Sequence, residues 1–285
     1  MSAVRGQLND LIRFSSVDGP GNRLVLFLQG CNFDCITCHN PYTIGLCNDC
    51  GECVQPCPEE ALTLDAELRI VLDEARCTRC DVCIEVCPIS STPLSRTTTV
   101  DDVLEELRPV APFLSGITVS GGEATLQPDF VAALFAAVKT DQELTGLSTL
   151  IDTNGSAPRG TWDRLLSVTD GFMVDLKALD PATHLELTGR DNALVLDAIR
   201  YLAGHDRLAE VRLLIVPGYN DDRETMVETA QWLHAVAPAT RVKVIGYRRH
   251  GVRGGALDIA EAGQEAIADL AEVARANGLL DVVMV

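Results

Sequence analysis

The chain has 285 residues, 47% of them hydrophobic, which is enough for one large α/β domain or two smaller ones around a packed core. A formal net charge of −18 and an aromatic content of only 5% argue against a nucleic-acid partner and give no reason to expect binding to an anionic membrane. No apolar run approaches the ~18 residues of a membrane-spanning helix, and residues 1–9 lack the apolar core of a signal peptide, so we expect a cytoplasmic protein with reduced thiols.

The first 44 residues carry an unusual cysteine run. Residues 7–29 predict a short strand, a Gly-Pro-Gly turn and a buried strand over the apolar residues 24–28. Cys31, Cys35 and Cys38 follow in a C-x3-C-x2-C run. Three thiolates cannot complete a structural zinc site, which takes four ligands, whereas on a four-iron cluster they leave one iron open to a small molecule. We therefore expect reactive chemistry in the loop that leaves this strand, where α/β barrels place their active sites.

The other eight cysteines lie in residues 45–91 and repeat one pattern, C-x2-C-x2-C-x3-C-P. This is the run of bacterial two-cluster ferredoxins, in which the fourth cysteine of each run ligates the other cluster. We therefore predict one [4Fe–4S] cluster on Cys47, Cys50, Cys53 and Cys87, and a second on Cys77, Cys80, Cys83 and Cys57. The alternative is a pair of zinc knuckles, which two complete runs with their trailing prolines disfavour.

After residue 92 the chain alternates helix and strand patterns. We expect strands at 116–120, 147–153, 171–176, 210–216, 241–247 and 281–285, and helices at 100–108, 129–139, 194–202, 223–236 and 261–276. Alternation with short loops predicts a parallel sheet. Six β/α units, counting the strand before the three cysteines, are fewer than the eight of a closed barrel. The prediction is a partial α/β barrel of residues 1–44 and 92–285 that carries residues 45–91 as an insertion.

The C-x3-C-x2-C run resembles the radical S-adenosylmethionine (SAM) enzymes. Two further segments resemble the activating enzymes of glycyl radical enzymes, a group related to pyruvate formate-lyase activating enzyme: residues 16–23, with the sequence Ser-Val-Asp-Gly-Pro-Gly-Asn-Arg, and His39-Asn40-Pro41. Within this group, the sequence around the cysteine run is most similar to the YjjW-type branch. The resemblance implies a partial (β/α)6 TIM-like barrel with a ferredoxin-like insertion, SAM, and three [4Fe–4S] clusters. It also implies reductive cleavage of SAM to a 5′-deoxyadenosyl radical, which takes hydrogen from a glycine of a partner glycyl radical enzyme, with an electron donor such as flavodoxin or ferredoxin.

The same resemblance assigns roles to residues in loops and at strand ends. Gly121, Gly122 and Glu123 would meet the amino group of SAM, although Gly pairs are also common in plain turns. Asn40 would lie near the cofactor. Asp18 lies where the family has an aspartate that lines the cleft, and it is counted with the three cysteines as part of the reactive centre.

Two further strand ends look like those that bind SAM's carboxylate in the pyruvate formate-lyase activating enzyme. By that likeness Asp152, Thr153 and Asp175, with the backbone of Met173, would form a small cation site, and Lys177 would pair with a carboxylate. The alternative for Asp152 is an Asx turn before Asn-Gly.

Arg212 and the last strand complete the resemblance less closely. Arg212 is a further candidate for SAM binding, or else a rim residue that extends its charge into solvent. Related enzymes carry Pro-Tyr-His near the last strand, whereas here Tyr247 is followed by Arg248, Arg249 and His250, so the histidine comes two places late. Either His250 or Arg248 is a candidate for that role, and His39 is a candidate for a helix start near the cofactor.

Two rival functions remain. A radical SAM enzyme that acts on a small molecule would share the three-cysteine run, but residues 16–23 speak against it. A ferredoxin-like electron carrier would need only the eight cysteines of residues 45–91, and it would leave the three-cysteine run and Gly121-Gly122-Glu123 unexplained. Formation of 5′-deoxyadenosine from SAM separates the carrier from the enzymes.

Overall fold

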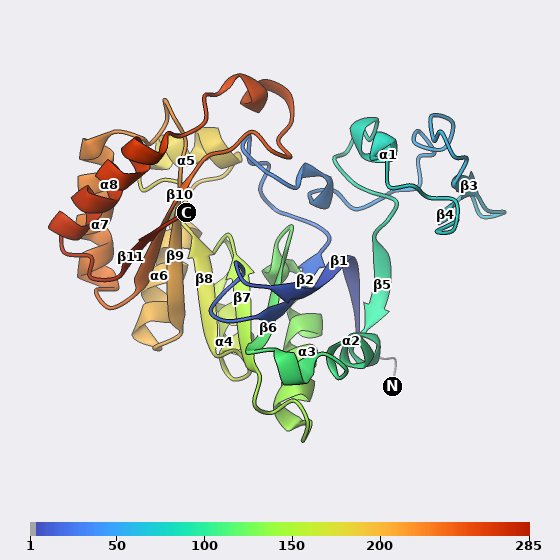
Figure 1. Cartoon of the computed structure of the whole chain (residues 1–285), viewed down its shortest axis with the longest axis horizontal. Coiled ribbons are helices and arrows are strands. Elements are labelled where there is room, and N and C mark those ends of the chain that lie inside the picture. Colours follow the sequence, from blue (N-terminus) through green and yellow to red (C-terminus); the bar gives the residue numbers. More distant parts are fainter. Residues whose placement is uncertain (1–3) are drawn as a thin grey trace.

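A computed structural model describes residues 4–285, which contain a nine-stranded sheet and a separate two-stranded one. The strands are β1 (Arg5–Ser15), β2 (Arg23–Leu28), β3 (Leu62–Leu64), β4 (Ile70–Leu72), β5 (Arg96–Thr99), β6 (Gly116–Gly121), β7 (Ser148–Thr153), β8 (Gly171–Asp175), β9 (Leu208–Ile215), β10 (Arg241–Gly246) and β11 (Val282–Met284). The large sheet runs in the order β11-β10-β9-β8-β7-β6-β2-β1-β5 (Figure 1). Strands β3 and β4 pair only with each other.

Six consecutive strands of the large sheet, β2 and β6 to β10, are parallel, and β11 continues them in parallel beyond β10. The predicted mostly parallel α/β sheet is therefore confirmed. The other edge differs, because β1 pairs antiparallel with β2 and β5 pairs antiparallel with β1. The two edge strands of the sheet, β11 and β5, do not pair with each other, so the sheet is open.

The helices form a row that follows the order of the strands. Their bounds are α1 (Val82–Glu85), α2 (Val100–Leu107), α3 (Pro128–Thr140), α4 (Arg159–Leu166), α5 (Pro181–Thr188), α6 (Ala193–Gly204), α7 (Arg223–Val236) and α8 (Gln264–Ala276). Contacts run from α2 to α3, α4, α6, α7 and α8 in turn, and the apolar faces of these helices bury the core against the sheet. Within residues 4–285, no helix has both the length and the apolarity needed to cross a bilayer.

Local signals explain where the predicted helices begin. The Thr99 hydroxyl accepts a hydrogen bond from the backbone N–H of Asp102, and the Asp102 carboxylate accepts one from the N–H of Thr99, which is a capping box at the start of α2. Pro128 occupies the first turn of α3, where its missing N–H costs nothing. Helices α4 and α5 were not predicted.

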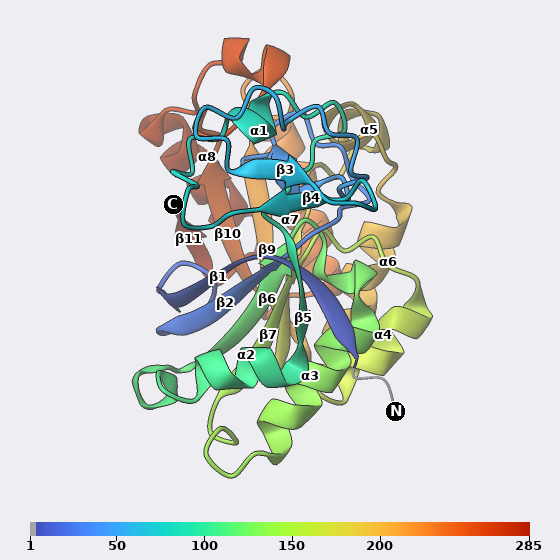
Figure 2. The same ribbon diagram turned by 90° about the vertical axis from the view of Figure 1, so that its right-hand side faces the viewer.

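Residues 45–91 lie beside the barrel and outside its sheet (Figures 1 and 2). They contain the β3–β4 hairpin and the short α1. The two ends of the segment meet where the backbone N–H of Gly45 donates to the carbonyl of Ser90 at 2.8 Å. The side-chain amide of Gln29 donates to the carbonyl of Gly45 at 2.6 Å and ties this junction to the end of β2.

A buried arginine holds the turn between β1 and β2 against β6 and β7. Arg23, at the start of β2, has no exposed surface. Its guanidinium donates to the hydroxyl of Thr118 at 2.7 Å and to the carbonyls of Ile117 and Ser148 at 2.7 and 2.9 Å. Two further hydrogen bonds, to the carbonyl of Pro20 at 3.3 Å and the hydroxyl of Ser148 at 2.9 Å, bring the total to five. Burial lowers the pKa of Arg23 to about 10, so the charge is retained at neutral pH.

We predict that Arg23→Met lowers the free energy of unfolding by about 3 kcal/mol or more, because several buried acceptors lose their only charged donor. Urea unfolding followed by circular dichroism measures this loss. Arg13→Met is the matched control, since Arg13 is paired with Glu106 on the surface and such pairs contribute about 0–1 kcal/mol. Equal effects of the two substitutions would contradict the role given to Arg23.

Candidate active site

One cavity of about 580 Å³ lies inside the barrel, towards the carboxyl ends of the parallel strands. Of the residues for which the sequence predicted a role in SAM binding or reaction, Met173, Arg248 and His250 do not line it. Thirteen others do: Asp18, Cys31, Cys35, Cys38, Asn40, Gly121, Gly122, Glu123, Asp152, Thr153, Asp175, Lys177 and Arg212. These residues come from the turn before β2, the loop after β2, and the ends of β6 to β9. The fold thus brings together positions spread over almost 200 residues, while their individual roles stay predictions.

The cysteine loop is held from two sides. Its own return pairs with its start, since the N–H of Cys31 donates to the carbonyl of Ile44 at 2.9 Å. On the other side, the N–H groups of Asp34 and Ile36 each donate at 3.0 Å to carbonyls at the end of α5, those of Thr188 and Leu187. Helix α5, which the sequence did not predict, therefore sets the shape of the loop that carries the three thiols.

Burial acts on the three thiols. It raises the pKa of Cys31 to about 12 and that of Cys35 to about 11, and it also raises the pKa of Cys38. The ammonium of Lys177 opposes this at Cys35 and Cys38. Binding of iron requires thiolates and therefore displaces the protons of these thiols.

Gly121 and Gly122 let the cysteine loop approach the end of β6. A side chain at Gly121 would come within 2.1–2.2 Å of the backbone of Leu28, and one at Gly122 within 2.3 Å of the carbonyl of Gly30. Gly121 also has a φ of +122°, which disfavours any other residue. These glycines are thus required by contact with the chain's own backbone, which is a different reason from the close approach to SAM that the sequence suggested.

Glu123 is buried and its carboxylate is engaged within the protein. It accepts hydrogen bonds from the N–H and hydroxyl of Thr125 at 2.9 and 2.6 Å, from the hydroxyl of Thr153 at 2.7 Å, and from the N–H of Asn154 at 2.7 Å. Burial raises the pKa of Glu123, and these four donors act against that rise. The carboxylate joins the ends of β6 and β7, so both Glu123 and Thr153 act first as supports of the cavity wall.

A layer of paired charges crosses the cavity on neighbouring strands. Asp152 on β7 pairs with Arg212 on β9 at 2.8 Å, and Asp175 at the end of β8 pairs with Lys177 at 2.6 Å. Burial raises the pKa of Asp152, whereas for Asp175 the Lys177 and Arg212 charges outweigh burial and lower the pKa. The carboxylates predicted to hold a small cation therefore already face two cationic side chains.

The sequence analysis missed two members of this layer. Glu210, on β9, contacts Arg212 at 2.8 Å and Lys243, on β10, at 3.2 Å. Lys243 lines the cavity. Glu210 and Arg212 are two residues apart on one strand and share a face, as the period of a strand requires, so the alternation around Arg212 was the signal that could have identified Glu210.

The three candidates near the last strand and the cysteine loop, namely His250, Arg248 and His39, lie in different surroundings. His250 is exposed, and Arg248 donates to the carbonyl of Ala262 at 3.0 Å; neither lines the cavity. His39 does line it, and Asn40 precedes the short 3-10 helix Pro41–Thr43, as expected for a helix start. The sequence alone could not show this, because the loop after β10 determines where these side chains lie.

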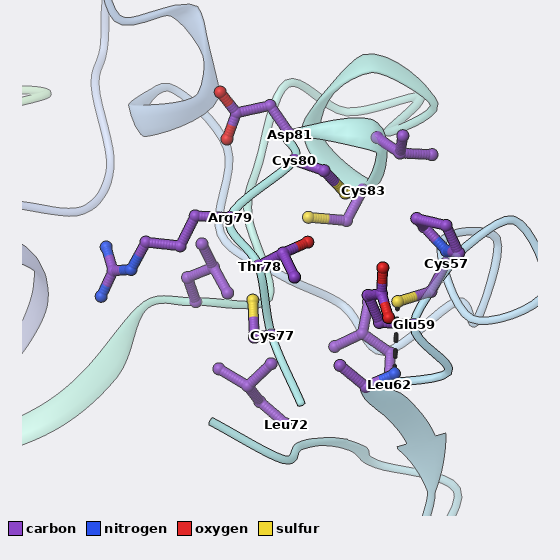
Figure 3. Close-up of a pocket in the computed structure, with 14 residues that line it drawn as sticks. Cys57, Glu59, Leu62, Leu72, Cys77, Thr78, Arg79, Cys80, Asp81 and Cys83 are labelled. Atoms are coloured by element: carbon purple, nitrogen blue, oxygen red, sulfur yellow. Dashed lines mark hydrogen bonds between the residues drawn. The ribbon is translucent and has the colours of Figure 1, made fainter. Parts of the chain in front are cut away.

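The eight cysteines of residues 45–91 meet in two groups. Figure 3 shows Cys57 on one side of a pocket that also carries Cys77, Cys80 and Cys83. The second pocket carries the first run together with the last cysteine of the second run, namely Cys47, Cys50, Cys53 and Cys87, and Cys83 also reaches it. Each pocket thus holds cysteines from both runs, and the assignment of cysteines to clusters stays a prediction.

The backbone of this segment repeats at an interval of 30 residues. Left-handed φ angles recur at Asp49 and Arg79, at Gly51 and Asp81, and at Glu60 and Ser90. The thiols of Cys57 and Cys87 each accept a hydrogen bond at 3.3 Å from the N–H four residues later. Alternation of right- and left-handed residues turns backbone N–H groups towards a common point, as in many iron–sulfur sites.

No group of three or more His, Cys, Asp or Glu side chains within residues 4–285 is positioned to bind a single metal ion. A four-iron cluster makes a different demand, because each of its cysteines binds a separate iron. The donor set in the barrel, three soft thiolates on one loop beside a charged cavity, fits such a cluster and a small zwitterionic ligand.

Comparison with known proteins agrees with this geometry. Residues 25–233 match the family model of the radical SAM superfamily, which is more than half of the chain. The chain belongs to the radical SAM superfamily. Membership implies a [4Fe–4S] cluster and SAM, for which the Cys31–Cys38 loop and its cavity are the fitting site.

Relatives of this radical SAM protein include the pyruvate formate-lyase-activating enzyme of Staphylococcus aureus strain USA300, 27% identical over 259 residues, which cover 87% of this chain and 84% of the relative. The predicted resemblance to pyruvate formate-lyase-activating enzyme is thereby confirmed. A domain of the pyruvate formate-lyase-activating enzyme from Bacteroides vulgatus ATCC 8482 matches 60% of this chain and 99% of its own, with a TM-score of 0.51 and 22% identity. QueE from Escherichia coli matches 99% of this chain and 94% of its own, with a TM-score of 0.56 and 11% identity. At these low identities the two structures support the fold alone.

We predict that Arg212→Gln weakens SAM binding by a factor on the order of ten or more, because Asp152 is left buried beside the cavity without its cation. Anaerobic titration calorimetry with SAM measures the change. Arg241→Gln is the control, because Arg241 lies at the start of β10, pairs with Asp281 and is about half exposed. An unchanged affinity in Arg212→Gln would contradict a role of this layer in holding SAM.

Proposed function

We propose that this radical SAM protein is an activating enzyme that takes a hydrogen atom from a glycine of a partner glycyl radical enzyme. With SAM bound, the cluster would supply the chemistry common to this type of enzyme, an electron that cleaves SAM into methionine and a 5′-deoxyadenosyl radical. The chain's own residues would bind and orient SAM and the partner's loop and exclude water.

The observation that carries the proposal is the position of Asp18. The turn that contains it, after β1, folds into the same cavity as Cys31, Cys35 and Cys38. The carbonyl of Asp18 accepts a hydrogen bond from the Thr118 hydroxyl at 2.7 Å, and Arg23 donates to the carbonyl of Pro20 in the same turn. The Asp18 carboxylate itself accepts a hydrogen bond from the Ser15 hydroxyl at 2.5 Å. Its other acceptor positions would bind N–H groups of an extended peptide that enters beside SAM.

The open sheet supports a polypeptide substrate. Strands β11 and β5 leave the barrel unclosed, so the cavity is not sealed by a ring of eight strands. The similarity to pyruvate formate-lyase-activating enzyme over 87% of the chain points the same way. A radical SAM enzyme for a small molecule remains the alternative, and it would use the same cluster and cavity.

Residues 45–91 would form a ferredoxin-like module with two further [4Fe–4S] clusters, which gives three in total. The crossed grouping of cysteines and the 30-residue backbone repeat support this. The group with Cys87 belongs to the chain segment that Gly45 and Ser90 tie to the end of β2. Electrons from a flavodoxin or ferredoxin would then pass through the module to the cluster in the barrel.

We predict about twelve irons in the reconstituted protein, and we predict that Cys57→Ala damages the cluster of Cys77, Cys80 and Cys83, because Cys57 shares their pocket. Mössbauer and EPR spectra of Cys57→Ala should match those of Cys80→Ala. Cys50→Ala is the comparison for the other cluster. Spectra of Cys57→Ala that match Cys50→Ala would refute the crossed ligation.

We predict that incubation with SAM, a reductant and a glycyl radical enzyme of the same organism produces the doublet EPR signal of a glycyl radical. Asp18→Ala should reduce that signal at least tenfold while slow, uncoupled cleavage of SAM persists, since Asp18 faces the peptide rather than the cluster. Asp101→Ala, on the exposed face of α2, is the control. Consumption of a small molecule in step with SAM, without any doublet, would overturn the proposal in favour of its alternative.

A further inference from the structure

Asn154, which follows β7, is a buried amide that no predicted role explains. Its side chain lines the cavity and is 8% exposed. Its oxygen accepts a hydrogen bond from the N–H of Ser156 at 2.9 Å, so the amide nitrogen faces the opposite way, towards the cysteine loop. There the nitrogen donates to the side-chain oxygen of Asn32 at 2.8 Å and lies 3.9 Å from the sulfur of Cys31, within reach of an N–H···S hydrogen bond.

The orientation of Asn154 is fixed by a chain of contacts. The amide of Asn32 donates in return to the carbonyl of Ser156 at 3.2 Å, so the two asparagines clamp the cysteine loop to the end of β7. Behind them, Glu123 accepts the backbone N–H of Asn154 at 2.7 Å. Because Glu123 is fully engaged with other donors, it holds this backbone in one place.

The three cysteines have different electrostatic surroundings. The positive charge of Lys177 acts on Cys35 and Cys38, and that of Arg253 also acts on Cys38, while Asp34 acts against them at both thiols. Cys31 instead lies near the negative charge of Glu123, and its close donors are the N–H of Phe33 at 3.4 Å and the amide of Asn154. Without these donors the Cys31 side of a cluster would face a buried carboxylate.

We propose that Asn154 is a positioning residue that donates a hydrogen bond to the Cys31 thiolate and thereby sets the reduction potential of the cluster in the barrel. Reduction adds negative charge to a cluster, and hydrogen bonds to its sulfur ligands stabilise the reduced form. Asn154 therefore makes this cluster easier to reduce, and it offsets the nearby charge of Glu123. The inference rests on membership of the radical SAM superfamily and does not depend on the nature of the substrate.

The test is an EPR-monitored redox titration of the whole reconstituted protein, with the cluster identified by the signal that changes when SAM is added. We expect the midpoint potential to fall in Asn154→Ala, by about threefold to tenfold in the equilibrium constant for reduction, where tenfold is 59 mV for one electron. Asn154→Asp should lower it further, because a carboxylate oxygen then faces the sulfur.

Asn32→Ala is the matched control. It breaks the same clamp but removes no donor to Cys31, so its midpoint potential should stay at the wild-type value. If Asn154→Ala and Asn154→Asp keep the wild-type potential, or if Asn32→Ala shifts it as much as they do, the proposal is overturned and Asn154 only holds the loop.

A second measurement needs no variant of Asn154. In protein labelled with ¹⁵N only in asparagine side chains, pulsed EPR of the reduced, SAM-responsive cluster should show a ¹⁵N coupling that survives Asn32→Ala. Absence of this coupling would also overturn the proposal. Glycyl radical formation is not involved in either measurement, so failure here leaves the proposed activase function untouched, and the converse holds.

Discussion

The active site depends on one buried carboxylate. Glu123 accepts four hydrogen bonds from residues at the ends of β6 and β7, and it lies beside two glycines whose bare backbones let the cysteine loop pack against β2 and β6. A buried charge of this kind is costly unless it is fully hydrogen-bonded, and here it is. The same contacts that stabilise the charge also fix the backbone of Asn154 and, through it, the loop of Cys31. Strand ends, cysteine loop and cavity wall therefore form one hydrogen-bonded unit.

The rest of the cavity is built on charge balance. Asp152, Asp175 and Glu210 face Lys177, Arg212 and Lys243 across four adjacent strands. Paired charges on rigid strands offer both signs to a ligand at fixed positions without a large cost of reorganisation. SAM carries an ammonium, a carboxylate and a sulfonium, and it can exchange contacts with such a layer. The price is stability, because paired buried charges seldom stabilise a fold more than apolar side chains would.

Much of the fold and the composition of the site could be predicted from the sequence, for physical reasons. The apolar run 24–28 and the alternation of helix and strand patterns after residue 100 predicted the parallel strands. Thr99 and Pro128 indicated where α2 and α3 begin. The cysteine spacings indicated iron–sulfur clusters, because thiolates at fixed short intervals are typical of metal ligands. Helices α4 and α5 were missed. For α5 the signals were present in Asp180 at its N-cap, Pro181 in its first turn and Gly189 at its end.

The internal partners of the site residues could not be predicted. Glu123 was expected to face SAM but binds Thr125, Thr153 and Asn154, and Asp152 was expected in a cation site but faces Arg212. Such pairings depend on strands that are neighbours in space and far apart in the sequence. Period-two alternation can indicate which residues share a face, as with Glu210 and Arg212, but it does not indicate which charge will lie opposite.

An isotope measurement tests whether a single hydrogen atom passes from a polypeptide glycine to the 5′-deoxyadenosyl radical formed from SAM. A glycyl radical enzyme of the same organism would be produced with deuterium at its glycine Cα positions and incubated anaerobically with this protein, SAM and a reductant. The account predicts 5′-deoxyadenosine that carries one deuterium, formed in proportion to the glycyl radical. Unlabelled 5′-deoxyadenosine, formed at full rate while the partner remains without a radical, would contradict it.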